Sequence, residues 1–228
     1  YLPFARGHSD KSACRKEPWS FGGEIERAVK AALERRMQLM PTLYTLFHEA
    51  AASGAPIARP MFFADARDPA LRDVDDQFML GADLVVAPVV HEGATKREVL
   101  LPPTSSGGWF LFPDGVDLLA PGRYTIDAPL GRTPVFARAG SIIATKPSKL
   151  HTGAQLGEEL ELHVFFDARQ RAVGRLYEDD GVSRGERGVK TELSAKVMRG
   201  RVVIDAFADG EEVLERAWRV HAHGLAKA

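Results

Sequence analysis

Apolar residues recur at three- and four-residue intervals across residues 23–52. This spacing is the period of an α-helix with one buried face, so it predicts a long helical unit. Pro41 lies inside the pattern and predicts a kink or a division into two helices, because proline lacks a backbone donor. Gly54 is suited to end the unit, since glycine readily adopts the left-handed conformation that closes helices.

Two shorter segments follow the helical unit. Residues 56–63 form an apolar run of strand length. In residues 75–80, DDQFML, acidic residues precede an apolar turn, which is typical of a capped helix start. We therefore expect a short helix that ends at Gly81. Helix, strand and helix in this order are typical of the closing units of a β/α barrel.

The pattern changes from Asp83 onward. Short strand-like runs separated by Gly, Pro and Asp replace the helical period, and they predict a β-domain of sandwich type. The runs are residues 84–90, 98–101, 108–112, 123–127, 133–138 and 141–144.

A second β-module is predicted after a polar stretch, residues 146–158, which has the composition of a linker. Alternating apolar and polar positions predict antiparallel strands there, and the tail after Gly210 fits either a closing strand or a short helix. The predicted strands are residues 159–166, 172–177, 189–197 and 201–207. The fold class is therefore α/β plus all-β, the C-terminal part of a (β/α)8 barrel followed by two antiparallel β-sandwich-type domains.

Composition places the 228 residues among ordinary globular proteins, with 45% hydrophobic and 27% charged side chains. Thirty basic and 31 acidic side chains give a formal net charge of −1, which argues against nucleic acid or an anionic membrane as the main partner. No apolar run approaches the roughly 18 residues of a membrane span. Cys14 is the only cysteine, so an intrachain disulfide is excluded, and we interpret it as an incidental thiol.

Arg6 and His8 are the candidate binding residues. They lie in a polar loop after an apolar start, which we interpret as the C-terminal end of a barrel strand. Barrel active sites are built on that face. An imidazole there can hydrogen-bond sugar hydroxyls, and a nearby guanidinium can hold a carboxylate in place. The alternative is an exposed or structural histidine.

Eight segments in the same order resemble glycoside hydrolase family 31, which contains α-glucosidases, α-xylosidases and related transglycosylases. They are YLPFARGHS, EPWSFG, RRMQLMPTLYTLFHEA, GAPIARPMFF, DDQFMLGADLVVAPVV, EGATKREVLLP, TPVFARAGSII and LYEDDG. The resemblance runs from Tyr1 to about Gly181. It implies the truncated end of a (β/α)8 barrel in residues 1–82, a proximal C-terminal β-domain in 83–146 and a distal one in 147–228.

The resemblance also implies roles for the loop. His8 matches the histidine of an FxRNH-type motif, which hydrogen-bonds the sugar in the subsite where cleavage occurs. Arg6 matches the arginine of that motif and is expected to support the pocket. Gly7 replaces the asparagine of the motif, which allows a different loop geometry.

No catalytic residue is expected within the chain. The family's nucleophile, an Asp in a W-x-D-M-N-E type segment, and its acid/base Asp have no counterpart, and both are expected upstream. We expect the loop carboxylates to serve as helix caps, as turn residues or in exposed ion pairs. These carboxylates are Asp10, Glu17, Asp65, Asp68, Asp75, Asp76, Asp179 and Asp180.

The implied function is that of a C-terminal fragment of a retaining α-glycosidase, with α-glucosidase favoured, that hydrolyses α-linked oligosaccharides by double displacement. No cofactor or metal is expected, and the fragment alone is expected to be inactive. The alternatives are an α-xylosidase or α-transglucosidase of the same family, or a non-catalytic carbohydrate-binding β-sandwich protein. The linkage, compartment and oligomeric state stay open.

Overall fold

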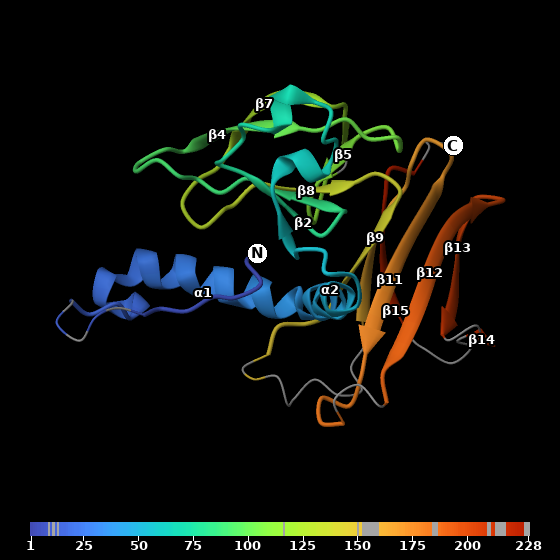
Figure 1. Ribbon diagram of the computed structural model, residues 1–228, viewed down its shortest axis with the longest axis horizontal. Helices are drawn as coiled ribbons and strands as arrows, with labels where there is room; N and C mark the ends of the chain where they lie inside the picture. The colour runs from blue at the N-terminus through green and yellow to red at the C-terminus, as the bar shows by residue number, and fades with distance from the viewer. Residues whose placement is uncertain are drawn as a thin grey trace.

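The computed structural model describes residues 1–8, 10, 12, 14–115, 117–149, 151, 160–183, 187–208, 211–212 and 218–225. Two consecutive helices lie beside a six-stranded sheet, a two-stranded ribbon and a seven-stranded sheet (Figure 1). The described part of the chain is thus mostly sheet with few helices, which is consistent with the predicted β-sandwich-type domains. Most of the predicted linker, residues 146–158, lies outside the described residues. None of the helices in the described part of the chain has the length and apolar character of a membrane span.

The helical unit is divided in two, as Pro41 predicts. After a 3-10 turn at Pro18–Phe21, helix α1 spans Gly23–Gln38 and helix α2 spans Met40–Ser53. Pro41 lies in the first turn of α2, where its missing N–H removes no helical hydrogen bond. Gly54 closes α2 with φ of 73°, and its N–H donates to the carbonyl of Ala50 at 2.8 Å.

The six-stranded sheet has the order β1-β2-β3-β8-β5-β6, and all its pairs are antiparallel. Its strands are β1 (Ala58–Arg59), β2 (Phe78–Leu80), β3 (Leu84–Val86), β5 (Trp109–Leu111), β6 (Leu118–Leu119) and β8 (Val135–Arg138). The predicted strand over residues 56–63 is much shorter than expected. Pro60 cannot donate to a ladder, and the next residues, Met61–Phe63, form a 3-10 turn.

The short helix predicted for residues 75–80 is wrong, because this segment enters β2 and turns back into β3. Gly81, with φ of 62°, lies in the turn between the two strands. Leu80 packs into the core on one face of the sheet, and Met79 packs into the core on the other face. Because both faces of the strand are buried, its apolar residues are consecutive in the sequence. Such a short run has the same pattern as one apolar turn of a helix.

Asp76 and Gln77, just before β2, bond to the neighbouring ribbon instead of capping a helix. This ribbon pairs β4 (Lys96–Leu101) with β7 (Gly122–Asp127). The Gln77 side chain accepts from the N–H of Leu100 at 2.9 Å and donates to its carbonyl at 2.7 Å. Asp76 forms an ion pair of 2.7 Å with Arg97.

Arg97 joins three segments through its guanidinium, although its side chain is only 9% exposed. It donates to the carbonyls of Pro88 at 3.0 Å, Glu98 at 2.6 Å and Asp76 at 2.8 Å. A planar guanidinium supplies several donors in a fixed geometry, whereas a lysine ammonium is a single point. Arg97 therefore holds the ribbon against the strand that follows Asp76.

The seven-stranded sheet has the order β14-β13-β12-β11-β9-β10-β15. Its strands are β9 (Ser141–Thr145), β10 (Leu160–Phe165), β11 (Arg171–Glu178), β12 (Val189–Met198), β13 (Arg201–Ala208), β14 (Glu211–Glu212) and β15 (Trp218–His223). Most pairs are antiparallel, as predicted, but β15 pairs parallel to β10 and β9 pairs parallel to β11. The C-terminal tail thus contains a strand, and a helix is excluded for Trp218–His223.

Residues 134–145 carry the chain from one sheet into the other. β8 belongs to the six-stranded sheet, and β9, which follows after Ala139 and Gly140, belongs to the seven-stranded sheet. Every residue of this segment is buried except Arg138, which is partly buried and forms an ion pair of 2.5 Å with Asp83. Val135 of β8 and Ile143 of β9 enter one core cluster, so the two sheets share a core. The division into domains at residues 82 and 146 remains a prediction.

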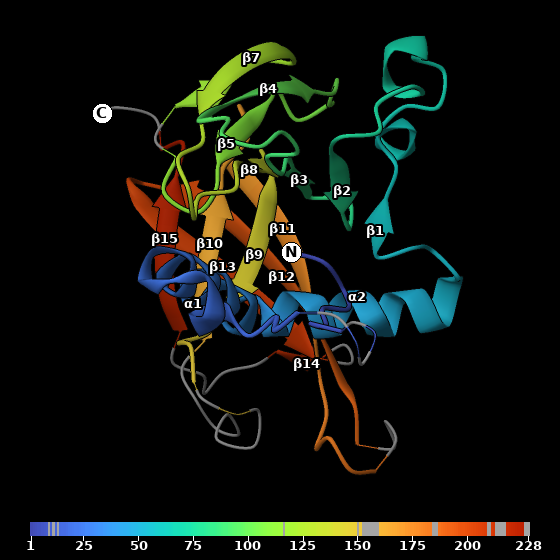
Figure 2. The same cartoon turned by 90° about the vertical axis from the view of Figure 1, so that its left-hand side faces the viewer.

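Helix α2 lies against β9 and β11 (Figure 2), and two threonines fix it there. Thr42 Oγ1 donates to the carbonyl of Ala144 at 2.7 Å. Thr45 Oγ1 donates to the carbonyl of Pro41 at 2.9 Å and accepts from the N–H of Tyr177 at 2.9 Å. Because Thr45 is buried, water cannot replace this link between α2 and β11.

Replacing Thr45 tests this link. In Thr45→Val the shape is preserved but the N–H of Tyr177 loses its buried acceptor, so we expect the free energy of opening of α2 and β11 to fall by about 1–3 kcal/mol. Hydrogen exchange of the amides in these elements measures the change. Thr125→Val makes the same change on the exposed face of β7 and should leave exchange in α2 and β11 unaltered. Equal exchange in Thr45→Val and the wild type would contradict the link.

Replacing Arg97 tests the second connection. Arg97→Lys keeps the charge beside Asp76 but cannot reach all three carbonyls, so we expect opening of β2 and β4 to become easier by about 1–3 kcal/mol. Arg123→Lys is the matched control, because Arg123 is exposed on the paired strand β7. If the amides of β2 and β4 lose protection from exchange equally in both variants, the buried guanidinium of Arg97 does not hold the ribbon in place.

Candidate functional site

The N-terminal segment that carries the predicted site lies along α1. Arg36 of α1 donates to the carbonyl of Leu2, and to that of Pro3 at 2.8 Å. Tyr1 packs against the core cluster shared by the two sheets, and burial raises the pKa of its phenol while Arg35 lowers it. The segment is thus fixed at its beginning, and residues 6–8 are exposed to solvent.

Arg6 and His8 are brought together by the structure. Arg6 Nη2 lies 2.9 Å from His8 Nδ1. A guanidinium can only donate, so Nδ1 is the acceptor and the neutral imidazole carries its proton on Nε2. Both side chains are exposed. With Nδ1 bonded to Arg6, the Nε2–H of His8 is the ring group that can donate to a ligand.

A shallow hollow of about 570 Å³ adjoins His8. Its charged lining is mainly basic, from Arg15 and Lys16, with one carboxylate from Glu17. Cys14 also lines it and is a free thiol. Such a hollow suits hydrogen-bond acceptors, but the structure does not test the predicted sugar-binding roles of His8 and Arg6, which stay predictions.

Most of the candidate carboxylates have structural partners. Asp179 accepts from the hydroxyl groups of Tyr44, at 2.8 Å, and Tyr177, at 3.0 Å, and from the N–H of Gly181 at 2.8 Å. Its charge raises the pKa of Tyr44 to about 12 through that hydrogen bond. Asp180 accepts from the N–H groups of residues 182 and 183, as expected for a turn residue. Both carboxylates therefore stabilise the turn after β11, and Asp179 also joins it to Tyr44 of α2.

Three further loop carboxylates also bond to near neighbours. Asp10 accepts from Ser12, and these hydrogen bonds lower the pKa of its carboxyl. Asp65 pairs with Arg67 at 3.0 Å, and Asp68 caps the 3-10 turn Pro69–Leu71 through the N–H of Ala70 at 2.9 Å. Local partners thus account for these side chains, and the absence of the catalytic pair from this set stays a prediction.

One side-chain cluster was missed by the sequence analysis. Glu161, His163 and His221 each place a possible ligand atom within 4.8 Å of the others. The available signal was the spacing of two residues in Glu161-x-His163 and His221-x-His223, which puts each pair on one face of a strand. Sequence reasoning could not bring the two strands together, because His221 lies 58 positions after His163.

Two sequence profiles match the chain. The profile of the glycosyl hydrolases family 31 TIM-barrel domain matches residues 1–46, and that of the glycosyl hydrolase family 31 C-terminal domain matches residues 54–143. Together they cover more than half of the 228 residues.

Among curated proteins, the chain is 35% identical over 184 residues to a probable glucan 1,3-alpha-glucosidase of Arabidopsis thaliana, which covers 80% of this chain and 20% of that protein. It is 32% identical over 222 residues to alpha-glucosidase 2 of Bacillus thermoamyloliquefaciens, which covers 96% of this chain and 28% of that protein. The chain therefore spans less than a third of the length of these relatives.

Solved structures give the same family. A family 31 dextranase of Flavobacterium johnsoniae, in complex with isomaltotriose, aligns with a TM-score of 0.82 at 30% identity over 92% of this chain and 27% of its own. A family 31 alpha-xylosidase of Xanthomonas citri aligns with a TM-score of 0.72 at 28% identity over 90% of this chain and 23% of its own. Profiles, relatives and structures agree that this chain belongs to glycoside hydrolase family 31.

Proposed function

We propose that this chain is the C-terminal part of a retaining α-glycosidase that removes terminal glucose from α-linked oligosaccharides. The observation that carries the proposal is the Arg6–His8 pair, which fixes the tautomer of an exposed imidazole within the stretch that matches the family's TIM-barrel profile. Two relatives at more than 30% identity are named as α-glucosidases, which favours glucose as the sugar. The α-xylosidase similarity keeps xylose as the second candidate.

His8 acts as a hydrogen-bond donor in this proposal. Its Nε2–H donates to a hydroxyl of the sugar in the subsite where cleavage occurs, and the hydrogen bond from Arg6 to Nδ1 orients the ring. A hydrogen bond that shortens as the sugar ring distorts stabilises the transition state more than the bound substrate. His8 therefore contributes to kcat/KM without exchanging a proton.

The bond-breaking step belongs to two carboxyl groups outside this chain. One carboxylate attacks the anomeric carbon while the other carboxyl group, as an acid, protonates the leaving oxygen. Water then attacks the covalent glycosyl-enzyme, the second group acts as a base, and the sugar leaves with its original configuration. This chemistry needs no metal or cofactor.

Exposed apolar side chains support the assignment of the N-terminal region to a larger barrel. Phe4 is 72% exposed and Trp19 is 66% exposed. Such groups are costly in water unless another surface covers them, and the remainder of a barrel is a suitable cover. Further exposed apolar residues in this region are Leu2, Phe21, Leu33 and Phe47. A self-contained carbohydrate-binding protein, the alternative from another class, gives no reason for this exposure.

Product stereochemistry tests the reaction. We expect the full-length protein to hydrolyse a p-nitrophenyl α-glucoside faster than the corresponding α-xyloside and to release the α-anomer first, as followed by proton NMR. Faster hydrolysis of the xyloside would favour an α-xylosidase instead of an α-glucosidase. Sugar binding without turnover would favour the carbohydrate-binding alternative, and release of the β-anomer would exclude double displacement.

The histidine has a test of its own. In the full-length enzyme, His8→Ala should lower kcat/KM by about 1–3 kcal/mol, roughly 5- to 150-fold, because a donor to the sugar is lost. His8→Gln, which keeps an N–H donor, should recover part of the loss. His91→Ala removes another exposed imidazole and should change nothing. Wild-type kinetics in His8→Ala would remove His8 from the site.

A further inference from the structure

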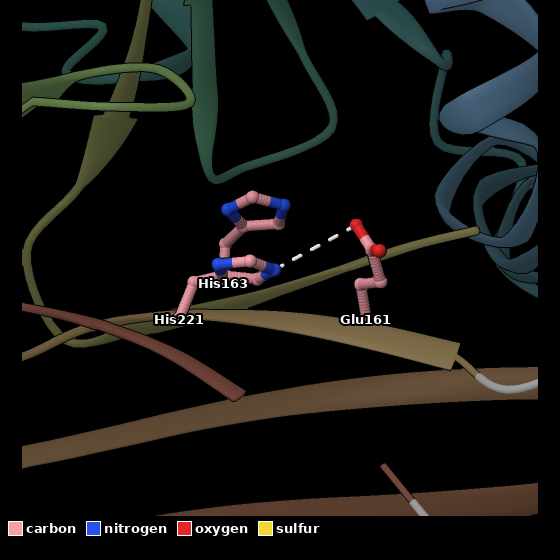
Figure 3. Close-up of side chains that lie close together, drawn as sticks. All are labelled: Glu161, His163 and His221. Carbon is pink, nitrogen blue, oxygen red and sulfur yellow. Dashed lines mark ion pairs between the residues drawn. The ribbon is translucent and has the colours of Figure 1, made fainter. Parts of the chain in front are cut away.

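The last strand of the seven-stranded sheet brings a second group of polar residues together. β10 and β15 run parallel in register, with His163 beside His221 and Phe165 beside His223. Side chains two residues apart on a strand point to the same face, so Glu161 and His163 from β10 lie on one face with His221 from β15. Figure 3 shows these three side chains gathered above the strands.

The two imidazoles are packed in an unusual way. The rings of His163 and His221 are stacked, with centroids 4.6 Å apart and an interplanar angle of 13°. His163 is 8% exposed, and its Nδ1 has no hydrogen-bond partner, while Nε2 lies 3.2 Å from Thr145 Oγ1. His221 Nε2 also lacks a hydrogen-bond partner and lies 3.7 Å from Glu161 Oε2. Buried polar atoms without hydrogen-bond partners are rare, so these two nitrogens are expected to bind a ligand.

The oxygen ligand of the cluster comes from Glu161. Its Oε2 lies 3.7 Å from His221 Nε2, while its Oε1 lies 3.4 Å from Arg219 Nη1. The ring nitrogens without a hydrogen-bond partner are His163 Nδ1 and His221 Nε2.

Space for an ion and water exists beside the cluster. A hollow of about 240 Å³ is bounded by the C-terminal turn of α1, by Phe112 and Asp114 after β5, and by the three residues of the cluster. Arg35 at its edge is a basic group that works against a cation there. The carboxylates of Asp114 and Glu161 in the same lining oppose this effect.

We propose that Glu161, His163 and His221 bind a divalent transition-metal ion of the class of Zn²⁺. Two imidazole nitrogens and one carboxylate oxygen suit Zn²⁺ and its neighbours, whereas Ca²⁺ and Mg²⁺ prefer oxygen ligands alone. Bonds of about 2.0–2.2 Å place tetrahedral ligands about 3.3–3.6 Å apart. The three atoms lie within 4.8 Å of one another, so they close by up to about 1.5 Å when the ion binds. Rotations of the side chains provide this movement, and water takes the fourth position.

The bound ion cross-links the two strands at the edge of the sheet. β15 pairs with one neighbour, β10, and an ion that joins Glu161 and His163 to His221 links the two strands through their side chains. Neither family profile reaches residues 161–221. The proposed metal site is thus independent of the proposed glycosidase reaction. Zn²⁺ binding can be confirmed even if the glycosidase proposal is wrong.

Zinc titration tests the site. The full-length protein is treated with a chelator, dialysed and titrated with Zn²⁺ against a chromophoric competitor. We expect one strong site in the wild type, and binding weaker by at least about 100-fold in His221→Ala, because loss of a mere supporting partner already costs up to that amount. His91→Ala removes an exposed imidazole elsewhere and should bind as the wild type does. Equal strong binding in His221→Ala, or no strong site in the wild type, would overturn the proposal.

A second variant and a second readout guard against misfolding. Glu161→Gln keeps the size of the side chain and should weaken binding while circular dichroism stays unchanged. Co²⁺ in the wild type should give the visible absorption of a four-coordinate nitrogen and oxygen site, and this absorption should be lost in Glu161→Gln. Zn²⁺ should also slow hydrogen exchange of β15 in the wild type and not in the variant. If Zn²⁺ leaves hydrogen exchange of β15 unchanged in the wild type, the ion does not cross-link β10 and β15.

Discussion

The rest of the structure depends on one buried segment, residues 134–145, that belongs to both large sheets. Gly140 lies at the crossing with φ of 79°, a conformation that glycine adopts without steric cost. Its N–H donates to the carbonyl of Phe165 at 2.7 Å, and its carbonyl accepts from the N–H of Val173 at 3.0 Å. The backbone is therefore paired with β10 and β11 at the point where it changes sheets, as a buried backbone must be.

The position of the candidate site follows from this segment through a series of contacts. The carbonyl of Ala144 in β9 accepts from Thr42 and so fixes α2, which continues from α1. Arg36 of α1 then holds the carbonyls of Leu2 and Pro3, a few residues before Arg6 and His8. In this way a β-framework that is far from the loop in sequence determines where the loop lies. The β-framework therefore fixes the position of the segment that precedes the predicted sugar-binding loop.

Local signals were sufficient where the partner of a residue is near in sequence. Pro41 and Gly54 set the helix boundaries through their own backbone preferences, and alternation predicted most strands. The proximity of Arg6 and His8 could likewise be read from their spacing, because only Gly7 separates them. These features needed no knowledge of the remainder of the fold.

Sequence reasoning failed where distant partners decide. Asp76 and Gln77 have the character of a helix cap, but Arg97 and Leu100, more than twenty residues later, use them to attach the ribbon. The cluster of Glu161, His163 and His221 depends on the parallel pairing of β10 with β15. Parallel neighbours are joined by long connections, so no short sequence pattern reveals their register.

The shared core makes a direct claim about unfolding, and hydrogen exchange in the full-length protein tests it. Amides of β3 and β8 report on the six-stranded sheet, and amides of β10 and β11 report on the seven-stranded sheet. As denaturant is raised, we expect both sets to open with the same free energy and the same dependence on denaturant. Opening of β10 and β11 at a lower free energy, while β3 and β8 stay closed, would show two independent cores and contradict the shared one.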